Sequence, residues 1–157
     1  MAQVNQDIRR ERGFILPQWG SVLLVDEDHA GLLYYSFIFR SFGCQVRSCA
    51  SYQEAERLLS CDAYDLVVVS QGSPKFEGRH VLERAIQIDR RMRVLVVART
   101  LDIPCYIEAM QLGAVDYLAE PVTEQELRRV AESHLRLEPL RPRSSFGKRH
   151  PLGSQPV

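Results

Sequence analysis

Five stretches of the chain have the hydrophobic pattern of β-strands, and a stretch with helical periodicity follows each of them. Three are nearly unbroken apolar runs, at residues 21–25, 65–70 and 94–98. Such runs are typical of strands that are buried on both faces of a parallel sheet. The alternation at residues 45–49 indicates a partly exposed edge strand, and residues 115–119 form a fifth strand candidate.

The segments between the strands have the spacing and the end signals of helices. Asp28 and Ser51 are suitable N-cap residues. In the helix after Asp28 we expect the buried side to consist of Leu32, Leu33, Phe37 and Ile38, with Tyr34 as a further candidate. The predicted helices cover about 29–42, the residues after Ser51, 78–89, 103–112 and 123–137. Strand and helix therefore alternate five times, which predicts an α/β protein with an all-parallel, doubly wound sheet.

Charge and composition divide the 157-residue chain into a body and two ends. Residues 1–20 hold three arginines against two acids, a net of +1, and residues 138–157 hold four basic residues against one acid, a net of +3. Because the whole chain has net charge 0, residues 21–137 carry −4. We expect an N-terminal leader (1–20), one domain (21–137) and a basic, Pro- and Ser-rich disordered tail (138–157).

The cysteine pattern and the hydropathy both indicate a cytoplasmic protein. The four cysteines show no paired spacing of the metal-binding or redox kind, so we expect reduced thiols. The chain has no apolar run of about 18 residues and no signal-peptide pattern at its N-terminus. We therefore expect no contact with a membrane.

Polar residues follow the predicted strands at the edge where α/β proteins place their chemistry. Asp26, Glu27 and Asp28 come directly after the first strand, and Ser70 ends the third. The carboxyl ends of parallel strands meet at one edge of the sheet. The three carboxylates would repel one another in one pocket, so some must point to solvent or face a cation.

Several motifs together make residues 21–137 similar to the response-regulator receiver domain of two-component signalling. These motifs are residues 25–28, residues 64–69 before a turn that leads to Pro74, residues 76–78, and residues 108–118 with Pro121 behind them. The resemblance implies a flavodoxin-like (βα)5 fold with strand order 2-1-3-4-5.

The resemblance also implies a set of site residues, and three of them are altered in this chain. In the family an acidic pair binds Mg²⁺, an Asp on the third strand accepts a phosphoryl group from a histidine kinase, and a Thr or Ser and a Lys end the next two strands. The corresponding residues here are Asp26 and Glu27 for the acidic pair, Ser70, Ala98 and Glu120 for the three altered positions, and Tyr117 for the switch aromatic.

These replacements predict a degenerate phosphorylation site and a pseudo-receiver that is not an enzyme. An unactivated serine is a weak nucleophile, Glu120 would repel phosphate oxygens, and Ala98 cannot connect a phosphoryl group to Tyr117. We expect no cofactor, and Mg²⁺ at Asp26 and Glu27 stays open. Either Glu120 joins these two acids around a cation, or Arg99 or Lys75 neutralises them, which we favour.

The predicted function is that of a stand-alone, receiver-like signalling protein that acts by protein–protein contact. Its partner would be a histidine kinase or an output protein, or a second copy bound through the face formed by 103–112, 115–119 and 123–137. Polar side chains of that face are Tyr106, Glu108, Asp116, Arg128 and Arg129. Alternatives are a switch by Ser/Thr phosphorylation, at Ser70 or at tail serines such as Ser144 and Ser145, and a less favoured nucleic-acid contact through the tail.

Overall fold

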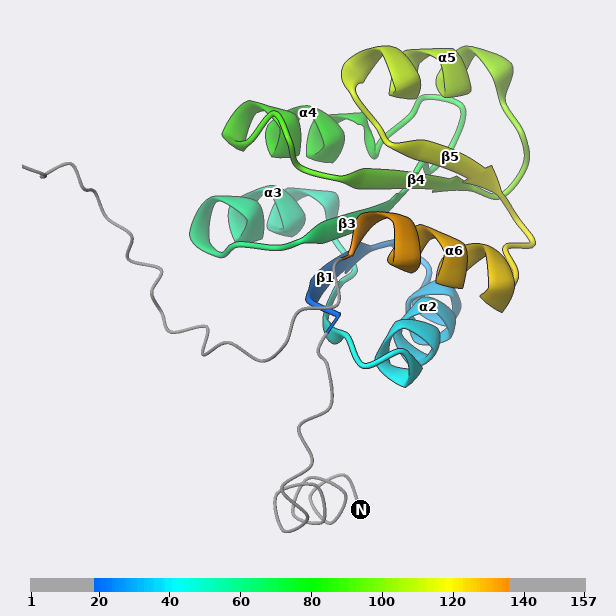
Figure 1. Cartoon of the computed structure of the whole chain (residues 1–157). Helices are drawn as coiled ribbons and strands as arrows, with labels where there is room; N and C mark the ends of the chain where they lie inside the picture. Colours follow the sequence, from blue (N-terminus) through cyan, green and yellow to red (C-terminus); the bar gives the residue numbers. More distant parts are fainter. Residues whose placement is uncertain (1–18, 136–157) are drawn as a thin grey trace, which may run out of the picture. The chain divides into compact units, whose positions relative to one another are not determined.

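The computed structural model describes residues 19–135, which form a five-stranded parallel sheet with helices on both faces (Figure 1). The strands lie in the order β2-β1-β3-β4-β5, as predicted. The strands are β1 (Ser21–Val25), β2 (Gln45–Cys49), β3 (Leu66–Ser70), β4 (Val94–Ala98) and β5 (Asp116–Ala119). The predicted leader and tail lie outside the described residues, apart from Trp19 and Gly20.

Five helices connect and flank these strands. They are α2 (His29–Ser41), α3 (Tyr52–Cys61), α4 (Arg79–Ile88), α5 (Ile103–Leu112) and α6 (Glu124–His134). The side chains of Asp28 and Ser51 cap α2 and α3 by accepting the backbone N–H of Ala30 and Glu54. The two residues that predicted the start of these helices therefore cap them in the structure.

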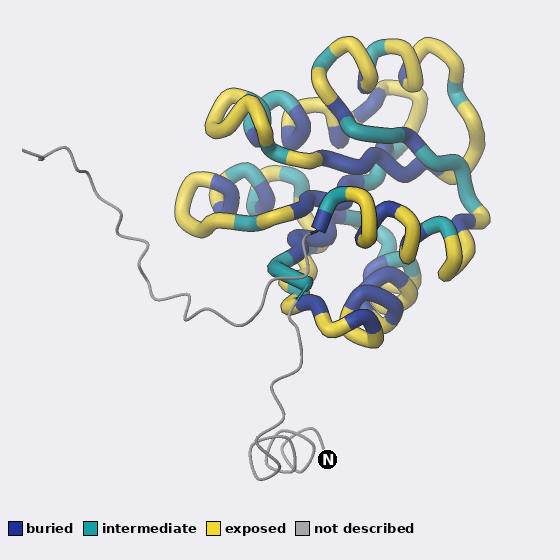
Figure 2. The backbone as a smooth tube through the Cα atoms, in the orientation of Figure 1, coloured by how far each residue is buried: buried dark blue, intermediate teal, exposed yellow. Residues whose placement is uncertain are grey.

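Each face of the sheet is covered by its own set of helices and has its own core. Val67 and Val69 point to the core under α3, α4 and α5, whereas Leu66 and Val68 point to the core under α2 and α6. This alternation follows from the two-residue period of a strand. The central strands are buried almost throughout (Figure 2), which explains their unbroken apolar sequences.

The buried side of α2 differs from the prediction. Leu32 and Ile38 are buried, but Leu33 and Phe37 are 72% and 75% exposed, and Tyr34 is also exposed. The side of α2 that faces the sheet instead contains Tyr35 and Phe39. Because apolar residues occur nearly all round this helix, the helical period alone does not identify which of them face the sheet.

No helix among the described residues is long and apolar enough to cross a membrane. The described cysteines are all free thiols, with Cys44, Cys49 and Cys105 buried and Cys61 exposed.

Candidate functional site

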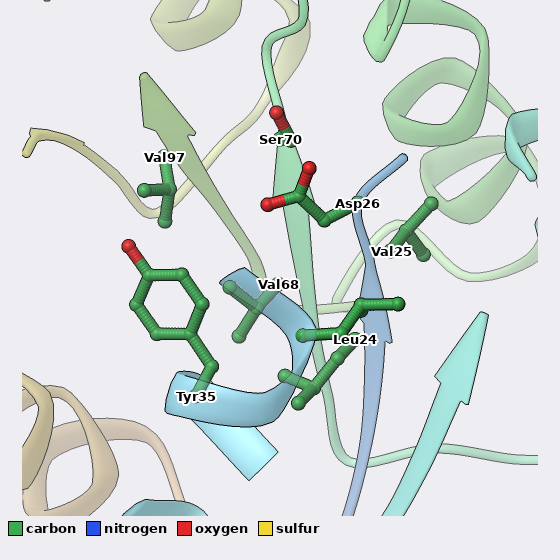
Figure 3. Close-up of a pocket in the computed structure, with 8 residues that line it drawn as sticks. Leu24, Val25, Asp26, Tyr35, Val68, Ser70 and Val97 are labelled. Carbon is green, nitrogen blue, oxygen red and sulfur yellow. The ribbon is translucent and has the colours of Figure 1, made fainter. Parts of the chain in front are cut away.

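The parallel register brings the predicted site residues to one edge of the sheet. Val25 pairs with Val69, Ser70 with Val97, and Ala98 with Ala119. The residues at or just after these strand ends, Asp26, Ser70, Ala98 and Glu120, therefore share the carboxyl edge. Figure 3 shows the carboxylate of Asp26 beside Ser70 at this edge, with the hydroxyl of Ser70 directed away from it.

A small pocket lies beside Asp26 and Ser70. It is lined mainly by apolar side chains of β1, β3 and β4 and by Tyr35 of α2 (Figure 3). Its volume of about 10 Å³ is close to the minimum that a single water molecule needs. The pocket is therefore too small for an organic ligand.

Asp26 is a half-buried carboxylate in a mixed electrostatic environment. Burial raises its pKa, and the negative charges of Asp28 and Glu120 raise it further. The backbone N–H of Asp28 donates to Asp26 Oδ1 at 2.9 Å, and this bond, together with the charge of Arg99, opposes the rise in pKa. The environment of Asp26 in the folded protein therefore disfavours its ionised form.

Arg99 pairs with one of the three carboxylates that follow β1. Its guanidinium lies 3.2 Å from Asp28 Oδ2, while Asp28 Oδ1 caps α2. Glu27 is exposed. The ion pair of Arg99 is thus with Asp28 and not with Asp26 or Glu27 as expected, and its charge only partly offsets the repulsion of Asp26 by Asp28 and Glu120.

Ser70 is hydrogen-bonded to neighbours that do not activate it. Its Oγ accepts the backbone N–H of Gly72 at 3.2 Å, and its side chain also bonds to Tyr52, which lowers the pKa of that phenol against the larger, opposite effect of burial. Within residues 19–135, Ser70 Oγ has neither a carboxylate nor an imidazole as a hydrogen-bond partner. The arrangement therefore lacks the adjacent base that a serine nucleophile requires.

The side chain of Glu120 is hydrogen-bonded to a residue of α2. The hydroxyl of Tyr35 donates to Glu120 Oε2 at 2.7 Å, and the backbone N–H of Glu120 donates to Ala98 O at 2.7 Å. Burial and the bond to Glu120 both raise the pKa of Tyr35, so this phenol stays a donor. Sequence patterns had placed Tyr35 in no role at this site.

The described residues hold no group of three or more His, Cys, Asp or Glu side chains arranged for a metal ion. The described residues therefore do not show Glu120 gathered with Asp26 and Glu27 as a cation site, and that alternative stays a prediction. Two acids, one of them exposed, leave most of the six or more oxygen ligands of Mg²⁺ or Ca²⁺ to water. Binding of Mg²⁺ to Asp26 and Glu27 alone stays a prediction.

Tyr117 is connected to the end of β3 through a residue that sequence reasoning missed. Its hydroxyl donates to Gln71 Oε1, and Gln71 directly follows Ser70. The backbone N–H of Asp102 donates to the same hydroxyl at 3.3 Å. Tyr117 is thus hydrogen-bonded to the residue after β3, and the sequence signal for this bond was a polar residue directly after a buried strand.

A second surface feature is the outer side of α5. Ile103, Ile107 and Met110 are exposed, and their i, i+4, i+7 spacing places them on one side of the helix. Polar residues of the predicted dimer face have partners within the chain: Glu108 pairs with Arg79 at 2.6 Å, and Arg128 pairs with Glu124 at 3.4 Å. The exposed part of this face therefore combines an apolar stripe on α5 with charged residues that form surface ion pairs.

Comparisons with known proteins agree on one family. Residues 22–132 match the response regulator receiver domain. The alginate biosynthesis transcriptional regulatory protein AlgB of Pseudomonas aeruginosa is 32% identical over 121 residues, covering 77% of this chain and 27% of AlgB. Sporulation initiation phosphotransferase F of Bacillus subtilis is 25% identical over 117 residues, covering 74% of this chain and 94% of that protein. The chain thus spans about a quarter of the length of AlgB.

Solved structures show the same architecture. A response regulator receiver domain protein from Clostridium thermocellum has a TM-score of 0.67 at 28% identity, covering 73% of this chain and 92% of that one. The receiver domain of the sensor histidine kinase PA1611 of Pseudomonas aeruginosa, solved with a magnesium ion in its active-site cleft, has a TM-score of 0.66 at 22% identity, covering 73% and 96%. The second likeness concerns the fold alone.

Proposed function

The chain belongs to the response regulator receiver domain family of two-component signalling, and from this premise we propose that it signals by protein–protein contact without phosphorylation on an aspartate. The observation that carries the proposal is Ser70 at the carboxyl end of β3, bonded to Gly72 and Tyr52. A serine there has no carboxylate to form an acyl phosphate and no base to make it a nucleophile.

The surroundings of Ser70 also oppose a bound phosphoryl group. Glu120 adds negative charge where a lysine would pair with phosphate oxygens, and Ala98 offers no hydroxyl. Arg99, the nearby cation, is paired with Asp28. A dianion entering this edge would meet the half-buried Asp26 as well.

A phosphoryl analogue tests the proposal directly. Acetyl phosphate or beryllofluoride with Mg²⁺ is added to the protein, and backbone amide NMR of the β3–α4 residues together with intact-mass measurement follows the result. We expect unchanged amide shifts around Ser70 and no added mass. Saturable shifts there, or a mass increase of one phosphoryl group, would overturn the proposal.

Stepwise restoration of the family residues provides a positive control for the same assay. Ser70→Asp alone should remain inert, because Ala98 and Glu120 still oppose the phosphoryl group. The triple change Ser70→Asp, Ala98→Thr and Glu120→Lys should gain binding of beryllofluoride. Ser133→Asp on α6, at an exposed serine, is the matched variant and should not respond.

For the partner surface we propose the face of α5, β5 and α6, with a second copy of the chain as its occupant. The support is the exposed apolar stripe of α5, formed by Ile103, Ile107 and Met110. A stripe that repeats at helical spacing can pack on its own copy about a two-fold axis.

Sedimentation of charged variants tests this surface. Ile107→Glu should shift the protein from dimer to monomer at micromolar concentration. Leu33→Glu adds the same charge at an exposed apolar residue of α2 and should leave the dimer intact. A monomeric wild-type protein, or equal loss of dimer in both variants, would contradict the proposal.

The other functions considered from the sequence have weaker support. Ser70 is half-buried and hydrogen-bonded, so a Ser/Thr kinase would have to open this edge to reach it. The tail serines Ser144 and Ser145, and the basic tail proposed for nucleic-acid contact, lie outside the described residues. No observation in residues 19–135 favours either function.

A further inference from the structure

Tyr117 is held at one rotamer by two hydrogen bonds in the interior of the protein. The side chain is 6% exposed, its hydroxyl donates to Gln71 Oε1, and the hydroxyl oxygen accepts the backbone N–H of Asp102 at 3.3 Å. Both the donor and the acceptor capacity of this phenol are therefore used. Burial raises the pKa of Tyr117, so the phenol keeps its proton.

Gln71 is itself fixed on several sides. It is 3% exposed, its Nε2 donates to Ser73 O at 3.2 Å, and its backbone N–H donates to Val97 O at 2.8 Å. Its backbone carbonyl accepts the N–H of Gly78 at 3.1 Å. The amide nitrogen must face Ser73, so the amide oxygen is left to accept from Tyr117.

The two hydrogen bonds of the Tyr117 hydroxyl join parts of the chain that are far apart in sequence. Gln71 belongs to the loop between β3 and α4, Tyr117 belongs to β5, and Asp102 is the N-cap of α5, where its Oδ1 accepts the N–H of Cys105 at 3.1 Å. The ring of Tyr117 also lies edge-on to Tyr106 of α5, with centroids 5.5 Å apart. The first turn of α5 is thus tied to the residue that follows Ser70.

From this geometry we infer that Gln71 is a positioning residue that holds Tyr117 in its buried rotamer and fixes the start of α5 without any modification of Ser70. The inference deepens the proposed function, because it names what sets the conformation of the α5 face when no phosphoryl group is present. The exposed stripe of α5 would then be presented permanently, in one arrangement.

Amide hydrogen exchange and tyrosine NMR on the full chain test the role of Gln71. In the wild-type protein the Asp102 amide should be protected, and the Tyr117 ring should give one set of signals with a single χ1 angle. Gln71→Leu keeps the size of the side chain but removes the acceptor. We expect exchange at Asp102 to rise at least tenfold and the Tyr117 signals to shift or broaden. Gln87→Leu, at an exposed glutamine of α4, should change neither reading more than twofold.

A second variant keeps the test valid if Gln71→Leu does not fold. Tyr117→Phe removes only the hydroxyl and should raise exchange at Asp102 by a similar factor. Averaged χ1 angles for Tyr117 in the wild-type protein, or an Asp102 amide that exchanges equally fast in the variants and the wild type, would overturn the inference. The beryllofluoride experiment tests the proposed function separately. Binding of beryllofluoride would overturn the proposed function, whether or not the Asp102 amide is protected from exchange.

Discussion

The hydroxyl of Tyr35 lies 2.7 Å from Glu120 Oε2, so a residue of α2 provides the partner for the acid that directly follows β5. Tyr35 is buried, and its pKa is raised by burial and by Glu120. The bond joins the helix layer of α2 to the end of β5.

Removing the Tyr35 hydroxyl should destabilise the protein. In Tyr35→Phe the partly buried carboxylate of Glu120 loses its donor, and a lost hydrogen bond to a charged group is worth about 1.5–3 kcal/mol. Urea unfolding at pH 7 measures the change in the free energy of unfolding. Tyr64→Phe is the matched control, since that hydroxyl meets Asp62 at 3.5 Å on the surface. An equal effect of the two variants would show that the bond to Glu120 contributes nothing.

Neutralising Asp26 should stabilise the protein. Burial and the charges of Asp28 and Glu120 raise its pKa, so the ionised form is penalised at neutral pH. Asp26→Asn keeps an acceptor for the Asp28 N–H and should add about 0.5–2 kcal/mol, the range of single stabilising changes. Because its pKa is raised, Asp26 takes up its proton at a higher pH in the folded protein than in the unfolded chain. The stability that Asp26→Asn gains over the wild type should therefore shrink as the pH falls from 7 toward about 4.

The control for this prediction is the neighbouring acid. Glu27 is exposed, and Glu27→Gln should change the free energy of unfolding by less than about 0.5 kcal/mol, as is usual at the surface. A destabilised Asp26→Asn protein would mean that the Asp26 carboxylate is needed to hold the loop after β1.

The strand pattern predicted the sheet accurately because the central strands are buried on both faces. Val67 and Val69 pack under one helix layer and Val68 under the other, so an apolar residue is required at every position. The helix α2 was harder, since Leu33 and Phe37 follow the apolar spacing but lie on the outside. The hydrophobicity of a residue shows only that it can be buried. Which side of α2 faces the sheet depends on how Tyr35 and Phe39 pack.

The placement of the candidate residues at one edge of the sheet could be predicted, but their hydrogen-bond partners could not. The shared location of Asp26, Ser70 and Glu120 could be predicted because the carboxyl ends of parallel strands meet at one edge of the sheet. The order of strands and helices along the chain is enough to predict a parallel sheet. Gln71 and Tyr35 could not be found in this way, because their hydrogen bonds join residues 46 and 85 positions apart. Only the packed structure brings such partners together.

The buried thiol of Cys44 predicts a loss of stability at alkaline pH. Burial, with a smaller effect from Asp65, raises its pKa from 9.0 to about 12. Above pH 9 the unfolded chain ionises this thiol and the fold does not, so stability that is present below that pH is lost between about pH 9 and 12. Cys44→Ala should flatten this fall by up to about 1.4 kcal/mol per pH unit. Cys61→Ala, at an exposed thiol, should follow the wild-type curve in urea unfolding at pH 8, 9.5 and 10.5.

Gly78 lies so close to the backbone of Ser70 that one added methyl group should strongly lower the stability of the protein. A Cβ at Gly78 would lie 2.2 Å from the backbone oxygen of Ser70, although the backbone there has an ordinary φ of −70°. Gly78→Ala should therefore destabilise by about 3 kcal/mol or more, as steric conflicts in a packed core do, and should shift the Ser70 and Gln71 amides. Gly113→Ala separates backbone strain from this conflict, because its φ is +109° and its Cβ would meet only Ile86, at 3.4 Å. That variant should lose about 1–2 kcal/mol and leave the Ser70 amide unchanged. If urea unfolding gave Gly78→Ala the smaller loss, the close packing of α4 against the end of β3 would be disproved.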